Sequence, residues 1–162
     1  MNDTVLEADH LAKRFKTVDA VRGVSFSVKR GELFGFLGPN GAGKTTTIKM
    51  LTTLLTPTSG TARVAGYDVV HDQARVREAI GIVFQEPSLD LVLTAEENLM
   101  FHGWLYGMKS RDIKERSREL LKLVELDTRA HEKVANYSGG MKRRLEIARG
   151  LLHEPTLFFL DE

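Results

Sequence analysis

A run of eight residues in this 162-residue chain has the types and spacing that bind a phosphate group. The run fits the pattern G-x-x-x-x-G-K-[ST] and consists of Gly38, Pro39, Asn40, Gly41, Ala42, Gly43, Lys44 and Thr45. Glycines let the backbone wind closely around an anion, so that amide N–H groups and the N-terminus of a following helix point at it. We expect Lys44 to reach the β- and γ-phosphates of a nucleotide, Thr45 to bind Mg²⁺, and Thr46 to contact the α-phosphate.

The segments on both sides of this loop are those that such a site requires. Leu33–Leu37 is a continuous apolar run, which predicts a strand buried on both faces. After the loop, apolar residues at helical spacing predict a helix that begins near Lys44 and ends at Pro57. A glycine-rich turn that merely caps a helix could show the same residues, but the flanking strand and helix favour phosphate binding.

Two carboxylates follow the last apolar run. Leu157–Leu160 predicts a strand, and Asp161 and Glu162 come directly after it, at the edge where ligands bind in open α/β sheets. We expect Asp161 to hold Mg²⁺ through water, and Glu162 to act as the general base that polarises the attacking water. The alternative is a strand followed by two solvated acids, which is the weaker interpretation beside a phosphate loop.

The rest of the chain alternates between strand and helix patterns, which predicts an α/β fold. Further strands are expected at Val5–Phe15, Ala20–Val28, Thr61–Val64 and Ile80–Val83, and further helices at Asp72–Ala79, within Thr94–Glu125, and after Ser138. We expect one domain, residues 1–162, with a phosphate-loop NTPase core (1–87 and 136–162) that includes an N-terminal antiparallel β subdomain. Residues 88–135 would form an inserted helical subdomain.

The segment from Tyr137 to Met141 identifies a family among the many that carry a phosphate loop. Its letters, YSGGM, resemble the L-S-G-G-Q signature of ABC ATPases, and it lies 16 residues before the terminal strand, as in that family. The resemblance implies that Ser138, Gly139 and Gly140 bind the γ-phosphate of a nucleotide held by an opposite subunit. Without the other motifs, an ordinary N-cap followed by flexible glycines would explain the same residues.

The same resemblance assigns three more positions. Gln85 looks like the Q-loop glutamine, which helps to bind Mg²⁺ and water, and it joins Lys44 and Glu162 as a catalytic residue. Phe15 resembles the aromatic residue that stacks on adenine, and Ala20 the small apolar contact to the nucleotide. Phe15 could instead belong to the core, and Gln85 could be an ordinary loop residue.

The resemblance spans Val5 to Glu162 and is closest to the ATP subunits of prokaryotic ABC-2-type drug and antibiotic exporters. It implies ATP and Mg²⁺ as cofactors, a second ABC ATPase domain that completes a dimer around two ATP molecules, and a membrane-spanning transporter subunit. The chain would lie in the cytoplasm, on the inner face of the cell membrane. The family continues beyond the acidic pair with a D-loop, further strands and a switch histidine, so we expect an incomplete domain.

Two other functions stay open. One is an ABC ATPase that acts on DNA or the ribosome. Three observations argue against this function. The net charge of +1 does not favour nucleic acid, the chain has no cysteine to bind zinc, and the 92 residues between Thr45 and Ser138 leave no room for a long coiled-coil insertion. The other is a chain that binds nucleotide without turnover. Lys142–Arg144 is expected to be a solvated helix face rather than a nucleic-acid patch.

A few residues outside these motifs carry weaker expectations. Trp104 and Tyr106 would either contact the membrane subunit or belong to the core. The histidines have no metal-binding spacing, and His10, His71, His102 and His131 are expected at the surface.

Overall fold

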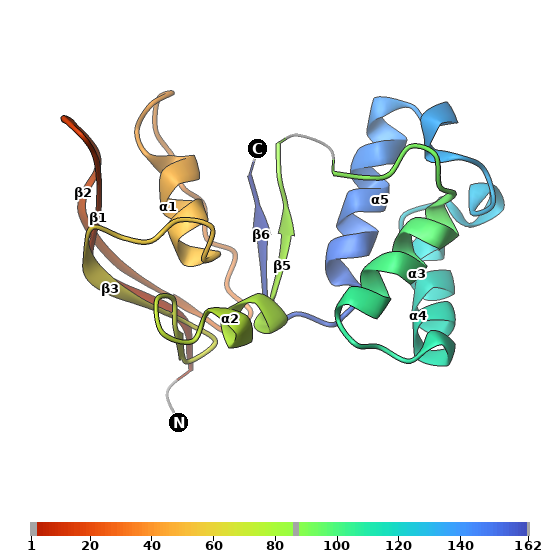
Figure 1. Cartoon of the computed structure of the whole chain (residues 1–162), viewed down its shortest axis with the longest axis horizontal. Helices are drawn as coiled ribbons and strands as arrows, with labels where there is room; N and C mark the ends of the chain where they lie inside the picture. Colours follow the sequence, from red (N-terminus) through yellow and green to blue (C-terminus); the bar gives the residue numbers. More distant parts are fainter. Residues whose placement is uncertain (1–2, 86–87, 162) are drawn as a thin grey trace. The chain divides into compact units, whose positions relative to one another are not determined.

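The computed structural model of this chain describes residues 3–85 and 88–161, and the order of its elements is shown in Figure 1. The chain divides into two compact units, Met1–Ile80 and Gly81–Glu162, which are described one at a time. The first unit contains β1 (Thr4–Phe15), β2 (Val18–Lys29), α1 (Lys44–Leu51), β3 (Ser59–Val64), β4 (Tyr67–Asp68) and α2 (Gln73–Ala79). The second contains β5 (Ile80–Val83, which begins at the boundary), α3 (Ala95–Leu105), α4 (Ser110–Leu123), α5 (Gly139–Leu151) and β6 (Leu157–Leu160), with short 3-10 turns at Asp127–Arg129 and Val134–Asn136.

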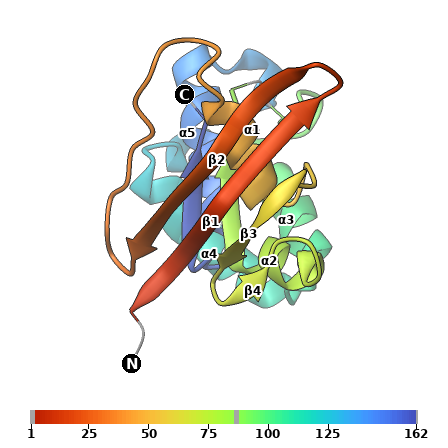
Figure 2. The ribbon, with the colours of Figure 1, turned by 90° about the vertical axis from the view of Figure 1, so that its left-hand side faces the viewer.

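The sheet of the first unit is antiparallel, with strand order β2-β1-β3-β4. Its long β1–β2 hairpin turns between Phe15 and Val18, which are paired, and β3 lies alongside β1 (Figure 2). The buried apolar residues of β1, which are Val5, Leu6, Ala8 and Leu11, do not alternate strictly, because the pairing with β2 shifts register at several points. The predicted N-terminal strands and their antiparallel pairing are therefore confirmed.

Helix α1 begins at Lys44 as predicted, but it ends at Leu51 rather than at Pro57. Thr53 takes a left-handed conformation, with φ of 65°, and its amide N–H donates to the Met50 carbonyl. A left-handed residue just after a helix closes the last turn and stops propagation, and here it does so before the proline is reached. Ile48, Met50 and Leu51 of α1 are buried in the core of this unit.

The prediction of a buried strand at Leu33–Leu37 is wrong. This segment has no regular secondary structure, and Leu33 and Leu37 are 99 % and 96 % exposed. Instead, Phe34 and Phe36 pack against Phe26 of β2, with ring centroids 5.2 and 5.3 Å from it. An interior strand needs hydrogen-bonding neighbours on both sides, and no described strand pairs with this segment.

In the second unit, β5 and β6 form a two-stranded sheet and run in the same direction (Figure 1). The Asp161 amide N–H, just after β6, donates to the Val83 carbonyl at 3.0 Å. Glycines let α5 approach this sheet closely: a Cβ on Gly81 would stand 2.3 Å from the Gly150 carbonyl oxygen and 2.6 Å from the Phe158 ring. The strands predicted at 80–83 and 157–160 are confirmed.

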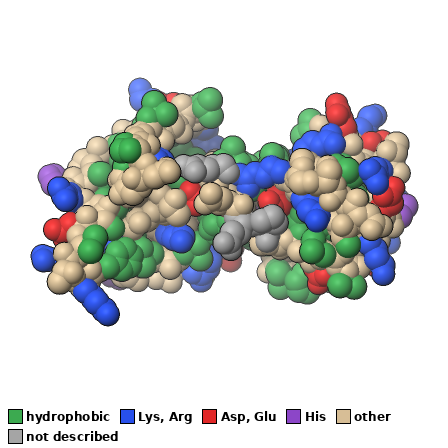
Figure 3. All heavy atoms as spheres, turned by 90° about the horizontal axis from the view of Figure 1, so that it is seen from above, with side chains coloured by type: hydrophobic (Ala, Val, Ile, Leu, Met, Phe, Trp, Pro, Cys, Tyr) green, Lys and Arg blue, Asp and Glu red, His purple; other side chains and the backbone are tan. Residues whose placement is uncertain are grey.

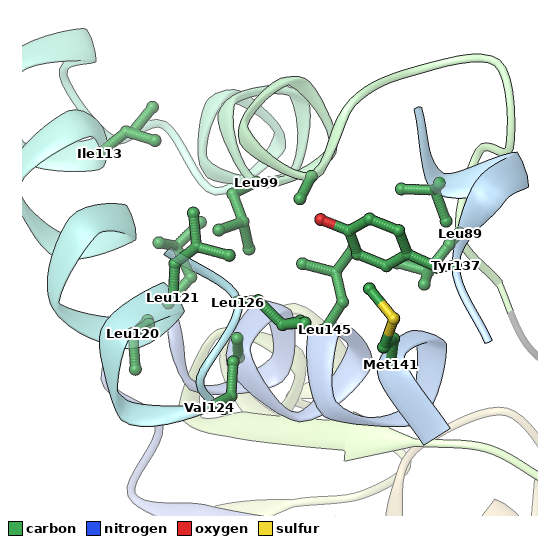
Figure 4. Packing of buried hydrophobic residues seen from close by; sticks show 14 residues of the cluster. Leu89, Leu99, Ile113, Leu120, Leu121, Val124, Leu126, Tyr137, Met141 and Leu145 are labelled. Atoms are coloured by element: carbon green, nitrogen blue, oxygen red, sulfur yellow. The ribbon is translucent and has the colours of Figure 1, made fainter. Parts of the chain in front are cut away.

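The helices of this unit surround one apolar core (Figure 4). It is formed by Leu89, Ala95, Leu99, Ile113, Leu120, Leu121, Val124, Leu126, Val134, Tyr137, Met141, Leu145, Ala148 and Leu152. Helix α3 starts at a complete capping box, because the Glu97 amide donates to the Thr94 hydroxyl and the Glu97 carboxylate accepts from the Thr94 amide. The helical pattern over 94–125, with its break before Ser110, is confirmed.

Side chains of both charges are interspersed with hydrophobic ones over the face seen in Figure 3. Among the residues that the structure describes, no helix is both long enough and apolar enough to span a membrane. The α/β class predicted from the alternating elements is confirmed, since an antiparallel sheet is combined with helices and a second pair of strands. The division into a core and a helical subdomain of residues 88–135 stays a prediction.

Candidate nucleotide-binding site

The phosphate loop connects the aromatic segment after β2 to the N-terminus of α1. Gly41 and Gly43 take left-handed conformations, with φ of 82° and 87°, which residues with a side chain rarely adopt. Gly43 also lies against β2, since a Cβ there would meet the Ala20 carbonyl oxygen at 2.4 Å. Position 43 therefore requires glycine for two reasons: its left-handed backbone angle and its close contact with β2.

Several amide groups of this loop are available to a ligand. In the described part of the chain, the N–H groups of Asn40, Gly41 and Gly43 have no acceptor, whereas Ala42 donates to the Pro39 carbonyl at 3.2 Å. Helix α1 also has no side-chain cap at its N-terminus, where Gly43 is the N-cap residue. Unpaired amides beside an uncapped helix N-terminus are suited to bind an anion such as a nucleotide phosphate.

The ammonium of Lys44 lies over this loop. It donates to the carbonyl oxygens of Gly38 at 2.7 Å and Pro39 at 3.1 Å. Thr45 is exposed in the first turn of α1, whereas the buried Thr47 hydroxyl donates to the Gly43 carbonyl at 2.9 Å. The loop thus offers a cation, amide donors and one exposed hydroxyl, which is the donor set that a magnesium-bound triphosphate needs.

Phe15 ends β1 at the hairpin, and its side chain is 45 % exposed. The Lys13 ammonium lies 5.2 Å from its ring centroid, within cation–π range. Phe15 is thus not a core residue, and its ring remains accessible for stacking on a base. Ala20, on the paired strand, is partly buried next to Gly43, so it lies at the phosphate loop.

In the second unit, Gln85 and Asp161 both lie just beyond the carboxyl ends of the paired strands β5 and β6. Asp161 is 6 % exposed and bonds through its amide to Val83, two residues before Gln85. Gln85 is exposed, while Glu162 lies outside the described residues. Among described residues, no group of three or more histidine or acidic side chains could hold a metal. A Mg²⁺ ion bound by one carboxylate and one amide would therefore depend on phosphate oxygens as further ligands.

Ser138 is the N-cap of α5, and its hydroxyl accepts from the Met141 amide at 3.3 Å. Gly139 and Gly140 are exposed, and a Cβ on either would meet no atom within 4 Å. Glycine within a helix costs about 1 kcal/mol relative to alanine, so packing within this chain gives no reason for two of them. Packing among the described residues therefore does not explain why glycine stands at these two positions.

A model of the ABC transporter family matches residues 21–162, which is most of the chain. The chain belongs to the ABC transporter family. It is 46 % identical over 158 residues to the linearmycin resistance ATP-binding protein LnrL of Bacillus subtilis, covering 98 % of this chain and 51 % of LnrL. It is also 46 % identical over 143 residues to the doxorubicin resistance ATP-binding protein DrrA of Mycobacterium tuberculosis, covering 88 % of this chain and 43 % of DrrA.

Solved structures agree with this membership. One, described as the ATP binding subunit of an ABC transporter, superposes with a TM-score of 0.89 at 33 % identity and covers 98 % of this chain and 66 % of its own. Another is cbiO1 of Clostridium perfringens, part of the ABC transporter complex cbiONQ, with a TM-score of 0.89 at 28 % identity. The ABC chain described here spans about half the length of the curated relatives that it matches.

The two departures from the ABC signature, Tyr137 and Met141, have a structural reason. Both are buried in the core of the second unit. The Tyr137 hydroxyl donates to the Arg129 carbonyl at 2.7 Å, and the Met141 sulfur lies 3.4 Å from an Arg129 guanidinium nitrogen. These two positions serve packing, whereas the exposed Ser138, Gly139 and Gly140 between them remain available to a ligand.

The solvated face expected at Lys142–Arg144 is partly present, since the side chains of Arg143 and Arg144 are 32 % and 40 % exposed, but both arginines also bond to backbone groups. Arg143 donates to the Phe84 carbonyl, and Arg144 donates to the Val124 carbonyl. These contacts join residues 59 and 20 positions apart, so a charge run read locally could not reveal them. The only local signal was the spacing of Arg143 and Glu146, which places both on one side of a helix.

One other expectation needs correction, and for Trp104 one of two alternatives is removed. His102 is partly buried rather than a surface residue, and this burial, with added repulsion from Arg149 and His153, lowers its pKa to about 4. Its Nε2 atom is buried without a hydrogen-bond partner among the described residues. Trp104 is not core, being 56 % exposed, and Tyr106 stacks on His153 with ring centroids 3.8 Å apart.

Proposed function

We propose that this chain is the ATP-binding part of a subunit that couples ATP binding and hydrolysis to the export of a small molecule. The observation that carries the proposal is the phosphate loop, in which unpaired amides, an uncapped helix N-terminus and the Lys44 ammonium converge. The export direction is supported by relatives whose names concern resistance to linearmycin and doxorubicin. A separate membrane-spanning subunit would carry the exported compound, and the chain would act at the cytoplasmic face of the membrane.

The residues have distinct parts in this function. Phe15 would stack on the base, with Ala20 beside it, and the loop amides of residues 38–45 would hold the phosphates. Lys44 would neutralise charge on the β- and γ-phosphates, which matters because phosphoryl transfer depends mainly on positioning and charge stabilisation. Thr46 would contact the α-phosphate.

The chemistry that Mg²⁺ would supply when bound is neutralisation of charge on the phosphates. The residues that would hold it are Thr45, Gln85 and Asp161. Glu162 would orient the water that attacks the γ-phosphorus. These roles follow from the residue types and the family pattern. They add the polar residues that follow β5 and β6 to the proposed nucleotide site.

A second copy of the domain would complete the site. Ser138, Gly139 and Gly140 present an exposed helix N-terminus, and a Cβ on either glycine would meet no described atom within 4 Å. A γ-phosphate held by the phosphate loop of a partner is an anion that such a terminus would bind. ATP would then join two domains, and hydrolysis would release them.

The proposal is tested by Lys44→Ala beside Lys49→Ala, an exposed lysine on the same helix. Binding of a fluorescent ATP analogue is measured for both variants and for the unmodified chain. We expect Lys44→Ala to weaken binding at least about tenfold, the equivalent of 1.4 kcal/mol, and Lys49→Ala to leave it unchanged. Equal affinities for the two variants would refute the assigned site.

Turnover is tested separately, by steady-state phosphate release from the 162-residue chain and from a version extended past position 162. Binding by both with turnover only by the longer one supports the proposal and shows that turnover also requires residues beyond position 162. Binding without turnover by either would favour a nucleotide-binding protein that is not an ATPase. Failure of a folded sample to bind would contradict the proposal.

A further inference from the structure

Three charged side chains on one side of α5 hold the residues that flank positions 85–87. Arg143, Glu146 and Arg149 are spaced three residues apart, so they lie along one side of the helix. Their partners are Phe84 and Ser88, which come just before and just after the segment that begins with Gln85. All of these residues belong to the second unit.

The contacts engage backbone groups at both flanks. The Arg143 guanidinium donates to the Phe84 carbonyl at 2.5 Å. The Ser88 amide donates to the Glu146 carboxylate at 2.8 Å, and the Arg149 guanidinium donates to the Ser88 carbonyl at 2.6 Å and to its hydroxyl at 2.5 Å. Ser88 therefore has its amide, its carbonyl and its hydroxyl all held by α5.

The carboxylate at the centre of this network is shielded from solvent, while the two arginines are partly exposed. Glu146 is only 2 % exposed, and its second carboxylate oxygen lies 3.7 Å from Arg143. Burial lowers the pKa of Arg149, and Glu146 acts in the opposite direction. Buried charges are costly unless they are paired, and replacing them with apolar residues is often neutral or stabilising. A contribution to stability therefore does not by itself explain this network. Directional hydrogen bonds to backbone groups also fix the position of those groups, which is the role considered next.

We propose that Arg143, Glu146 and Arg149 form a clamp that positions Gln85 for its contact with the nucleotide-bound Mg²⁺. Arg143 is the positioning residue nearest to Gln85, since it holds the carbonyl of the peptide that joins Phe84 to Gln85. The inference rests on the proposed function, because it assumes that Gln85 serves that ion. It adds three residues whose effect on the site passes through Gln85.

The clamp also links Gln85 to the helix N-terminus at Ser138. A helix is a rigid element, and Arg143 lies five residues after its N-cap, about 7.5 Å along the axis. A displacement of α5 when a phosphate binds at Ser138 is therefore transmitted to Phe84 and Ser88 through the clamp. The same three residues thus connect Gln85, which would serve the ATP of this chain, to Ser138, which would contact the ATP of a partner.

The test compares Arg143→Ala with Arg144→Ala, in the version extended past position 162. Arg144 is a matched control because it also donates to a backbone carbonyl, that of Val124, at 2.9 Å. The measurement is the rise in melting temperature with added Mg²⁺ at saturating ATP, which yields an apparent Mg²⁺ affinity without relying on turnover. Loss of a residue that orients a metal ligand typically weakens metal affinity about 10- to 100-fold.

We expect Arg143→Ala to weaken Mg²⁺ affinity about 10- to 100-fold and Arg143→Lys to recover part of that loss. We expect Arg144→Ala to leave Mg²⁺ affinity unchanged. We also expect Gln85→Ala to weaken Mg²⁺ to a similar degree, and the double variant Arg143→Ala/Gln85→Ala to be no weaker than Gln85→Ala alone. If Arg143 acts only through Gln85, removing both residues costs no more Mg²⁺ affinity than removing Gln85. If Arg143→Ala merely lowered stability, the effects of the two substitutions would add.

Two results overturn the inference in different ways. If the unmodified protein binds Mg-ATP and Arg143→Ala matches Arg144→Ala in Mg²⁺ affinity, the clamp has no positioning role and the proposed function stands. If the unmodified, folded protein shows no stabilisation by Mg-ATP, the proposed function fails, and the clamp fails with it.

Discussion

Gly43 lies against the backbone of Ala20, so closely that a Cβ on Gly43 would stand 2.4 Å from the Ala20 carbonyl oxygen. This contact joins the end of the phosphate loop to strand β2 within the first unit. It follows that the loop cannot tolerate a side chain here, whether or not a nucleotide is bound.

We therefore predict that Gly43→Ala lowers the free energy of unfolding more than Gly41→Ala does. Both positions have left-handed backbone angles, which cost an alanine about 1–2 kcal/mol. Only Gly43 adds a steric conflict, worth about 1–3 kcal/mol more, because a Cβ on Gly41 would meet nothing within 4 Å. Urea denaturation of the two variants provides the comparison, and equal losses would show that the contact with β2 is unimportant.

A second prediction separates the capping role of Ser138 from its proposed phosphate contact. Aspartate is as good an N-cap as serine, so Ser138→Asp should preserve the melting temperature, whereas Ser138→Ala should lose about 1 kcal/mol. The added carboxylate would repel a partner's γ-phosphate, so Ser138→Asp should lose ATP-dependent dimerisation. Dimerisation is measured by light scattering in the extended version, and a dimer of normal affinity would contradict the assigned contact.

The third prediction concerns the packing of α3 on α4. A Cβ on Gly103 would stand 2.6 Å from Cγ1 and 2.7 Å from Cδ1 of Ile113, which is fully buried. We expect Gly103→Ala to destabilise the chain by about 1–3 kcal/mol through overpacking, and Ile113→Ala by about 2–5 kcal/mol through a cavity.

The double variant Gly103→Ala/Ile113→Ala is the decisive measurement for this pair. The new methyl group would enter the space that the isoleucine leaves, so the combined loss should fall short of the sum by about 1 kcal/mol or more. Strict additivity in chemical denaturation would mean that the two residues are not in contact.

The fourth prediction is a dependence of stability on pH through His102. Burial is the main cause that lowers its pKa from 6.5 to about 4 in the folded chain, so between these values the unfolded state binds more protons. Stability should therefore fall as the pH decreases through this window, by at most about 2 kcal/mol between pH 7.5 and pH 5.0 from this residue.

His102→Phe should remove this component, since phenylalanine does not titrate and can still pack against Tyr106, whose ring centroid lies 4.9 Å away. His131→Asn is the control, because the His131 side chain is 86 % exposed and its ion pair with Glu96 contributes little. The free energy of unfolding is measured for each variant at both pH values. A pH dependence in His102→Phe equal to that of the unmodified chain would assign the effect to other groups.

Local features of this fold could be predicted because their physical causes lie within a few residues. The capping box of Thr94 and Glu97 depends on groups three residues apart, and Ser138 caps a helix through an amide three residues away. The two strands of the hairpin are joined by a short turn between the paired residues Phe15 and Val18, so their pairing also begins locally. In each case the stabilising contact is encoded in a short window, so pattern and structure agree.

The segment Leu33–Leu37 shows where this reasoning fails. An apolar run reports only that a segment avoids water, whereas a strand also requires neighbours that supply hydrogen bonds, and those come from elsewhere in the chain. The same applies to Arg143 and Arg144, which belong to a basic run in the sequence but donate to distant carbonyl oxygens in the structure.

The sequence by itself determined the family, the phosphate loop, the starts of the helices and the alternation of strands, because glycines, caps and short-range periodicity act over one or two turns. Only the tertiary structure decided that Gly43 rests on Ala20, that Tyr137 and Met141 are core residues, and that α5 holds Phe84 and Ser88. The physical reason is that these contacts join residues far apart along the chain, and their energies depend on packing and burial that arise only when the chain has folded.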